Sequence, residues 1–591
     1  MKTYEKKLMY LILLTIAILA IACSLQMSFA TTDFEINDKL DEGILYGISQ
    51  TGDGKTLTLK SGTYNKSGQD VGISIDKSIT IQGNGSPDSV VIDAHGHSSR
   101  IFSIGADDLN VKFVNLTFKN ANFNGNGGAV INPYANTVMT FINCSFINNQ
   151  VTGSGGAIHN SGNKMNLSNC KFEDNKASFG GAVFNNRNFD MYVEESNFAD
   201  NIADYGGAIY NYFANNVIIV NSNFESNKAI VYDGGAIYNQ DSDNLSISYC
   251  NFINNFASII GYGGAVFNNA KGMIISNSNF TYNIAEHGAG IYNSGLNLNI
   301  KNSNFTNNRG SIDSGHGGAI YNSGSNMDVS SSNFNENSAK HGGAIFNEHN
   351  DESIVSNSNF TNNHAAKNGG AIFNSGTKTS ISISSFKNNH AEMGGALYNN
   401  HEASNSIISD SKFINNFDDY DLNGIINFAT DFTIINPIFD EEETNGDVGN
   451  LNPNNVTPDS NTGVNKITTT ETNKGANTAT NTDIKTAAKT ATPPAPKKAD
   501  LKITQITKKG SSYYVVVKNI GKAAAGKNTL GVYVGKKLIK TVSVKSIGIG
   551  KNLKVKVVIP KKYLKLVKTF KVDIKNVVKE SNKNNNSFKY K

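Results

Sequence analysis

One short motif recurs along most of this chain and limits the folds that the chain can adopt. Gly-Gly-Ala followed by an aliphatic residue occurs ten times, with one variant at Gly288-Ala289-Gly290-Ile291. The ten copies begin at residues 127, 155, 180, 206, 234, 263, 317, 342, 369 and 394, so the step is 25 to 29 residues once the variant is counted. A period of this size is typical of a solenoid, in which single repeats cannot bury their own core and therefore stack on one another.

A phenylalanine marks a second fixed point in each repeat. It stands at residues 118, 146, 172, 198, 224, 252, 280, 305, 334, 360, 386, 413 and 439, and eleven of these thirteen have Asn three residues later. The residue five places before the Phe is apolar, as in Ile219, Ile247 and Ile275, and the residue two places before it is usually Ser or Cys. This alternation predicts short β-strands with one face turned inward.

Stacking predicts parallel strands about 4.8 Å apart and a rod of roughly 60 Å. Asn in the turns is expected to hydrogen-bond its counterpart in the next coil, and the Gly pairs allow a turn without a Cβ clash. Cys144 and Cys170 would lie one coil apart. A disulfide between them is conceivable, but we favour small buried thiols.

The two ends of the chain differ from the repeats. Basic residues, an apolar run over 8–23, and Ser28 and Ala30 predict a cleaved signal peptide, with a membrane anchor as the alternative. Strand-like alternation after a Pro-rich stretch predicts a seven-stranded, immunoglobulin-like sandwich. The expected parts are a signal peptide at 1–30, a cap and first coils at 31–105, the repeats at 106–440, a disordered linker at 441–498 and the sandwich at 499–591.

Charge separates the two halves of the chain. Residues 497–591 contain 25 Lys and 3 acidic residues, a net charge of +22, and the remainder has a net charge of −18. A strongly basic module on an exported protein is expected to bind an anionic envelope polymer. The alternative is a soluble sandwich that is merely coated with lysine.

Three segments resemble known families. Gly206-Gly207-Ala208-Ile209 with Phe198-Ala199-Asp200-Asn201 resembles the repeats of chlamydial polymorphic outer membrane proteins and, even more, those of adhesin-like proteins of methanogenic archaea. The segment Ile79-Thr80-Ile81-Gln82-Gly83 resembles the opening coils of pectin-lyase-like proteins, and the ending from Val572-Asp573-Ile574 resembles the CARDB module. These resemblances imply a right-handed, single-stranded parallel β-helix, followed by an immunoglobulin-like sandwich, in an archaeal surface adhesin.

A carbohydrate-active enzyme is the competing class, because β-helices also carry polysaccharide lyases and glycosidases. Such enzymes need paired carboxylates or a calcium site with a base. The clusters Glu194-Glu195, Asp351-Glu352 and Asp418-Asp419-Tyr420-Asp421 occur once each and are interpreted as solvated turns, although the last is also a possible calcium site. We therefore nominate no catalytic residue and expect no cofactor.

Histidines precede the Gly pair in three successive coils. Stacking would align His287, His316 and His341, and it would also align His364 with His390. Such a column is a weak candidate for zinc or for a pH-sensitive strip. Other coils carry unrelated residues at this position, which favours an unconstrained turn and no metal site.

The position after the aliphatic residue is almost always aromatic. If the aliphatic residue points inward, these side chains point outward and form a ladder that binds sugars or proteins. The alternative is that the rings pack against turns and stabilise the rod. The candidate ladder consists of Phe184, Tyr210, Tyr238, Phe267, Tyr292, Tyr321, Phe346, Phe373 and Tyr398, with His159 before it.

The sequence therefore predicts an extracellular, cell-surface or wall-associated adhesin-like protein. Its expected partners are cell-wall or host glycans or surface proteins, with an anionic polymer at the basic module, and neither nucleic acid nor a membrane anchor after signal cleavage. The alternatives are a carbohydrate-active enzyme and a structural component of the cell envelope.

Overall fold

The computed structural model shows two compact units, Met1–Lys474 and Gly475–Lys591, which are described separately. The predicted signal peptide lies outside the described residues. No helix of the described chain has the length and apolarity needed to cross a membrane. The structure describes residues 32–39, 43–187, 190–348, 351–418, 424–440, 468–470, 499–509, 512–520, 525, 528–534, 537–545, 547, 551–559, 563, 568–572 and 587–590.

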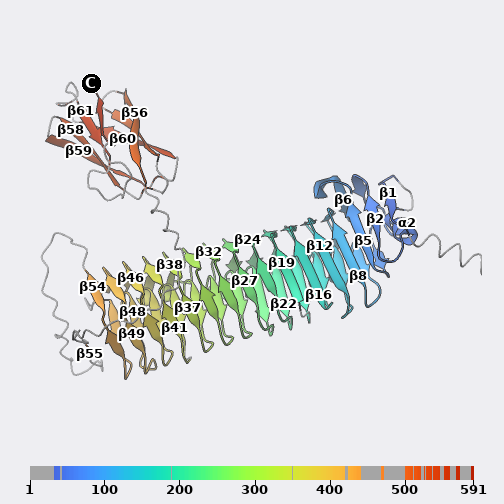
Figure 1. Ribbon diagram of the computed structural model, residues 1–591, viewed down its shortest axis with the longest axis horizontal. Helices are drawn as coiled ribbons and strands as arrows, with labels where there is room; N and C mark the ends of the chain where they lie inside the picture. The colour runs from blue at the N-terminus through green and yellow to red at the C-terminus, as the bar shows by residue number, and fades with distance from the viewer. Residues whose placement is uncertain are drawn as a thin grey trace, which may run out of the picture. The chain divides into compact units, whose positions relative to one another are not determined.

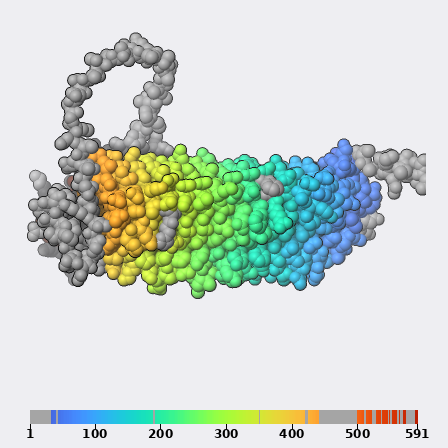
Figure 2. Space-filling view, turned by 90° about the horizontal axis from the view of Figure 1, so that it is seen from below, coloured from blue at the N-terminus to red at the C-terminus, as the bar shows by residue number. Residues whose placement is uncertain are grey.

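The first unit is a parallel β-helix (Figure 1). One coil runs through β16 (Lys164–Ser168), β17 (Lys171–Glu173) and β18 (Val183–Asn186), and β19 (Asp190–Glu194) begins the next coil. These strands belong to three long sheets, the first, second and third, which contain 17, 15 and 14 strands within the described residues. The bands of colour in Figure 2 follow one another in chain order along the solenoid, as stacked coils require.

The three long sheets begin in the first coils and continue to the last repeat. They run from β1 (Phe34–Ile36) to β53 (Thr433–Ile435), from β3 (Gly62–Tyr64) to β54 (Ile438–Asp440), and from β4 (Ile73–Ile75) to β52 (Ile425–Asn427). Within the expected linker, β55 (Thr468–Thr470) is described and pairs in parallel with β53.

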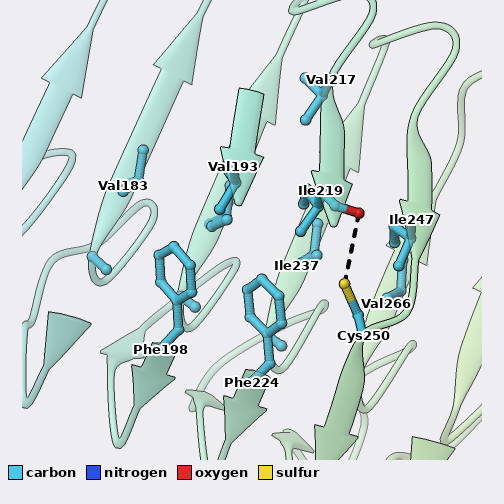
Figure 3. Packing of buried hydrophobic residues seen from close by; sticks show 14 of the residues in the cluster. Val183, Val193, Phe198, Val217, Ile219, Phe224, Ile237, Ile247, Cys250 and Val266 are labelled. Carbon is cyan, nitrogen blue, oxygen red and sulfur yellow. Dashed lines mark hydrogen bonds between the residues drawn. The ribbon is translucent and has the colours of Figure 1, made fainter. Parts of the chain in front are cut away.

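Equivalent residues of successive coils pair in register. Phe146 lies opposite Phe172, which lies opposite Phe198, and the ring centroids of each pair are 4.6 Å apart. These rings are fully buried, and so is Ile219 in the column five residues before Phe. Figure 3 shows these columns as core side chains contributed by neighbouring coils. The predicted in-register parallel stacking is therefore confirmed.

The small residue two places before Phe is buried and hydrogen-bonded. The hydroxyl of Ser196 donates to the carbonyl of Glu194 at 2.8 Å. The backbone N–H of Ser196 donates to Ser222 Oγ in the next coil at 3.1 Å, so the hydroxyls of this column link successive coils. Cys250 fills the same slot, and its thiol lies 3.6 Å from the carbonyl oxygen of Ile219 (Figure 3). Cys144, Cys170 and Cys250 are free buried thiols, as the favoured interpretation expected.

The Asn three residues after Phe forms a buried amide ladder. Asn227 donates from Nδ2 to the carbonyl of Phe198 at 2.9 Å and to Asn255 Oδ1 at 3.0 Å. Its own Oδ1 accepts the backbone N–H of Asn201 at 3.2 Å and the Nδ2 of Asn201 at 2.9 Å. All four hydrogen-bonding positions of this amide are thus used, which confirms the predicted contact between Asn residues of successive coils.

The N-terminal end of the solenoid is covered by a short helix, α2 (Gly43–Gln50). Ile44 and Ile48 of this helix are buried in the solenoid core. The helix is fixed by Asp70, whose Oδ1 accepts the N–H of Ile44 at 2.9 Å. It lies beside β1, which pairs in parallel with β2 (Lys55–Leu59), so the first coil does not leave the core open to water at this end.

The second unit is an antiparallel β domain. Its two sheets, β56-β57-β60 and β59-β58-β61-β62, share one core that includes Tyr513, Val515, Leu530 and Phe570. The described residues of this unit form seven strands: β56 (Leu501–Lys509), β57 (Ser512–Asn519), β58 (Asn528–Val534), β59 (Lys537–Val544), β60 (Asn552–Val558), β61 (Lys568–Lys571) and β62 (Ser587–Tyr590). The predicted seven-stranded, two-sheet arrangement is confirmed.

Candidate binding surface

In each of the ten Gly-Gly-Ala repeats, the chain enters its strand of the third sheet through the Gly pair. Gly206 has a φ of +61°, and a Cβ at this residue would lie 2.5 Å from the carbonyl oxygen of Ile209. A Cβ on Gly207 would lie 2.2 Å from the carbonyl oxygen of Gly235 in the next coil. Only glycine fits such a tight turn against a neighbouring backbone. The pair brings the residue before it against the outer face of the third sheet.

The nine aromatic residues predicted as a ladder all lie in the third sheet, each in register with the next. Their ring centroids are 4.5 to 5.4 Å apart along the column. His159 extends the column and stacks on Phe184 at 5.0 Å. The supporting strands after β18 are β22 (Ile209–Tyr212), β26 (Ile237–Gln240), β30 (Val266–Asn268), β33 (Ile291–Asn293), β36 (Ile320–Asn322), β40 (Ile345–Asn347), β44 (Ile372–Asn374) and β48 (Leu397–Asn399).

These rings lie outside the solenoid core but are not open to solvent. They form two clusters of their own, and seven of the nine expose only 5 to 9% of their surface. Tyr292 and Tyr398 are half-buried. Most of the rings stack face to face on the rings above and below, and Tyr210 meets both of its neighbours edge to face. The two-residue alternation therefore placed these side chains outside the core but did not predict that neighbouring rings cover them. This burial agrees with the alternative interpretation, in which the rings pack against turns and stabilise the rod.

A second row of rings covers the edges of the ladder. These residues directly precede the Gly pairs, and we call them the outer row: Phe179, Tyr205, Tyr262, His287, His316 and His341. Ring centroids lie 5.2 Å apart for Tyr205 and Tyr238, 4.9 Å for Tyr262 and Tyr292, and 4.4 Å for His316 and Phe346.

The outer row is more accessible than the ladder, and Phe179 is 38% exposed. The sequence interpretation of this position as an unconstrained turn missed these contacts. The available signal was that the residue before the Gly pair, or before its variant, is aromatic or histidine in six of the eleven coils. Spacing alone does not reveal that the Gly pair folds these residues onto the third sheet.

The three outer-row histidines lie in one column, as predicted, with tilted or edge-to-face rings that are neutral at neutral pH. Ring centroids are 4.8 Å apart for His287 and His316 and 5.2 Å apart for His316 and His341. The backbone N–H of His316 donates to His287 Nδ1 at 2.9 Å, so this ring nitrogen of His287 already accepts a hydrogen bond. Burial lowers the pKa of His316 to about 3 and that of His341 to about 4, and it also lowers the pKa of His287. Among the described residues, no three His, Cys, Asp or Glu side chains are arranged to hold a metal ion.

The second predicted histidine pair is also in contact. His364 and His390 stack with centroids 5.1 Å apart, and their Nδ1 atoms are 3.1 Å from each other. One proton therefore lies between the two rings. Burial, together with the charge of His390, lowers the pKa of His364.

The ladder hydroxyls are protonated donors. Tyr210 donates to Gln240, and Tyr321 donates to Glu348 in the next coil. Burial raises the pKa of Tyr292 to about 12 and raises the pKa of Tyr210 and Tyr321 as well. The rings of the aromatic surface are therefore uncharged at neutral pH. Asp233 occupies the outer-row position between Tyr205 and Tyr262, and burial raises its pKa to about 6.

The carboxylate clusters are engaged within turns. Asp351 accepts the hydroxyl of Thr377, and Glu352 Oε1 lies 3.3 Å from Lys378 Nζ, both across one coil step. Asp418 is the described member of the cluster at 418–421, whose other residues lie outside the described chain. The contacts of Asp351 and Glu352 agree with the interpretation of these two residues as solvated decorations of turns, whereas Asp418 is buried, with 6% of its surface exposed.

A shallow polar groove of about 400 Å³ crosses the first coils. Sequence reasoning did not find it, because its residues come from a loop and two separate repeats. Its lining side chains carry amide, hydroxyl or imidazole groups. They belong to His95, His97, Ser98, Asn120, Asn122, Asn148 and Gln150, with Gly96 between the two histidines.

The second unit presents its lysines to solvent. Lys502, Lys518 and Lys556 are exposed on its strands. Other lysines lie over tyrosine rings: Lys554 Nζ is 5.3 Å from the ring centroid of Tyr514. The basic charge predicted from the sequence is thus spread over the strands of the sandwich.

The fold and its surface define a class: a repetitive parallel β-helix joined to an antiparallel β domain. Residues 496–590 match the CARDB family, and residues 143–161, 331–348 and 357–375 match the Chlamydia polymorphic membrane protein repeat. The resemblances to the CARDB module and to the polymorphic membrane protein repeat are therefore confirmed. The matches support a surface-associated β-helical protein.

Two solved structures are similar to this chain. One is the A-module of the mannuronan C-5 epimerase AlgE6 of Azotobacter vinelandii, with 11% identity, a TM-score of 0.25, and coverage of 66% of this chain and 91% of the other. The other is a double mutant of the tailspike protein of E. coli bacteriophage HK620 with a pentasaccharide, with 11% identity, a TM-score of 0.26, and coverage of 85% and 86%. At these TM-scores neither structure bears on the ligand or the reaction. A search of curated proteins finds no match.

Proposed function

We propose that this protein is an extracellular, adhesin-like protein that binds glycans or other cells through the outer row of the third sheet. The observation that carries the proposal is the outer row itself, two runs of neighbouring rings that are more accessible than the ladder beneath them. One run holds Phe179 and Tyr205, the other begins at Tyr262, and Asp233 lies between the two runs. Phe179 and Tyr205 have their centroids 5.8 Å apart, and Tyr262 and His287 have theirs 5.0 Å apart.

The two layers have different roles in this proposal. The ladder fixes the outer row, because each outer ring rests on a buried ring that is itself stacked in register. A rigid, uncharged aromatic surface suits the apolar faces of sugar rings, and the tyrosine hydroxyls and imidazoles supply hydrogen bonds to sugar hydroxyls. The proposal places no charge requirement on the ligand, in contrast to the basic second unit, which we propose holds an anionic envelope polymer.

The test compares two exposed aromatic sites. The double variant Phe179→Ser and Tyr205→Ser removes adjacent outer-row rings and leaves the ladder in place. Tyr249→Ser is the matched control, because Tyr249 is 62% exposed but lies in a different turn. Binding to a glycan array and to intact cells should fall at least tenfold for the double variant and stay unchanged for the control, with thermal unfolding confirming that both are folded.

Equal binding by both variants would refute the outer row as the binding surface. Absence of binding by the folded wild-type protein would favour a structural component of the envelope. Release of shortened or unsaturated products from the same glycans would instead identify a carbohydrate-active enzyme. Substitution of ladder residues such as Tyr238 is a weaker test, because that ring is 8% exposed and its loss would disturb folding.

A further inference from the structure

The largest departures from the regular repeat occur at one corner of four successive coils. The spacing from Phe to the first Gly of the pair is eight residues in the compact coils, as from Phe198 to Gly206, but ten from Phe224, eleven from Phe252 and twelve from Phe305. The coil between the last two, which starts at Phe280, keeps the compact spacing of eight. Three longer loops therefore lie around the short loop of the coil that starts at Phe280.

The side chains on these loops are apolar and open to solvent. Ile259 is 83% exposed, Ile260 66%, Ile230 49%, Ile312 44%, Val231 41%, and Ile284, in the compact coil, 40%. We call these six residues the loop patch. They expose on the order of 600 Å², which is at the upper end of the largest apolar patch on a typical monomer, roughly 300–600 Å².

The loops are held by their backbones. The N–H of Tyr232 donates to the carbonyl of Asp204 at 3.1 Å, and that of Glu286 donates to Gly261 at 2.8 Å. The N–H of Ser311 donates to the carbonyl of Glu286 at 3.2 Å. These bonds link each loop to its neighbour, so the apolar tips are fixed in place and lose little conformational entropy when they are covered.

We infer that the loop patch joins two copies of this protein side by side, through a two-fold axis that passes between the coils of Phe252 and Phe280. Such an axis sets the raised Ile259-Ile260 tip of one copy against the low position at Ile284 of the other. The same axis sets the loop at Ile230 of one copy against the loop at Ile312 of the other, so apolar side chains face apolar side chains along the contact, as a closed two-fold contact requires. With Tyr232 and the polar border, the patch approaches the roughly 800 Å² that one partner contributes to a stable interface.

The charges at the border favour the same arrangement. Lys228 lies on the first coil of the patch and Asp313 on the last, and both are exposed. The two-fold axis brings Lys228 of each copy to the coil that carries Asp313 in the other. Glu286 and Arg309 add one charge of each sign, and Asp233 adds a further carboxyl beside Tyr232, so the border has no excess of positive charge. An anionic lipid surface would require an excess of positive charge, which this border lacks.

The test measures the mass of the purified full chain by sedimentation velocity over a range of protein concentrations. Wild type should be a dimer at micromolar concentration. The variant Ile259→Asn with Ile260→Asn should dissociate about 100-fold more readily, because it removes two apolar anchors. The control is Ile383→Asn, which removes an isoleucine that is 65% exposed on a distant coil and should leave the dimer intact. Production in a bacterial host avoids glycosylation of the Asn-Ser-Ser sequence that this control creates.

A charge exchange tests the geometry. Lys228→Glu should weaken the dimer about tenfold, and adding Asp313→Lys should restore it, because only the proposed axis brings these two positions together. A monomeric wild type, or a dimer that survives the double Asn substitution, would overturn the inference. Binding of monomeric wild type to phosphatidylcholine vesicles, lost in the double variant, would also overturn it and assign the patch to lipid. Glycan binding is scored separately, so failure here leaves the proposed function untouched.

Discussion

The buried amide ladder offers the sharpest test of how this solenoid is held together. Replacing Asn227 with Ala removes four hydrogen bonds, two donated to Phe198 and Asn255 and two accepted from Asn201. Asn227 is completely buried, so water does not replace these partners. A buried polar group left without a partner costs about 1–3 kcal/mol.

The main groups that lose their hydrogen-bond acceptor are the backbone N–H of Asn201 and one hydrogen of its Nδ2. Asn255 Oδ1 keeps the hydrogen bond from the backbone N–H of Asn227, at 3.1 Å, and loses only the one from Asn227 Nδ2. The loss of local stability should therefore be about 4 kcal/mol, which corresponds to roughly a thousandfold change in the opening equilibrium. Each coil contacts only its neighbours, so the effect should be confined to the adjoining coils.

Amide hydrogen exchange followed by mass spectrometry measures this local opening. Peptides that cover 196–230 should exchange roughly a thousandfold faster in Asn227→Ala, and peptides from distant coils should be unchanged. The control is Asn223→Ala in the same coil, whose Oδ1 accepts Asn251 Nδ2 at 2.7 Å in an exposed ladder. Water replaces that bond, so this variant should differ from wild type by about 0.5 kcal/mol or less. Equal acceleration in both variants, or less than tenfold in Asn227→Ala, would contradict the reasoning.

Four further outcomes follow from the structure. The folded pKa of His316 is about 3 and its unfolded pKa is about 6.5, so stability is full above pH 6.5 and is lost as the pH falls toward 3. His316→Phe should reduce the loss of urea resistance between pH 7 and pH 4.5, and an unchanged loss would exclude this histidine. Ile383 has a φ of +50°, which a β-branched residue adopts only under strain, so Ile383→Asn should raise the free energy of unfolding by about 1 kcal/mol in a denaturant titration. Burial raises the pKa of Cys170 to about 12, so native protein should not react with a thiol reagent until it unfolds. Binding of the full chain to an anionic polysaccharide should fall more than tenfold on addition of about 1 M salt, and retention would refute the electrostatic account.

The columns of the solenoid were predictable because the period fixes them. Once the Phe residues are aligned, Ile219 and Ile247 fall on the inward face, and the small slot of Ser222 and Cys250 follows from the two-residue alternation of a strand. The same alternation placed Tyr210 outside the core. It did not indicate whether anything covers that outer face, which depends on the path of the chain through the Gly pair.

The outer row and the loop patch were beyond reach for a related reason. A residue such as Tyr205 has no regular partner in its own repeat, and its contacts with Tyr210 and Tyr238 appear only when the turn folds back on the third sheet. The exposure of Ile259 depends on the length of one loop relative to the next. The repeat period and the two-residue alternation of strands predict only the positions that recur in every coil. The outer row and the loop patch vary from coil to coil.

The division between repeated and variable positions has a consequence for function. Residues such as Phe224 and Asn227 are fixed by stacking, because a change in one coil removes a partner from the coils on either side. A turn residue such as Phe179 or Ile260 contributes little to that stacking and varies freely from coil to coil. Recognition should therefore be encoded in the turns that precede the Gly pairs, where substitution alters the surface while the core and amide columns keep the coils in register.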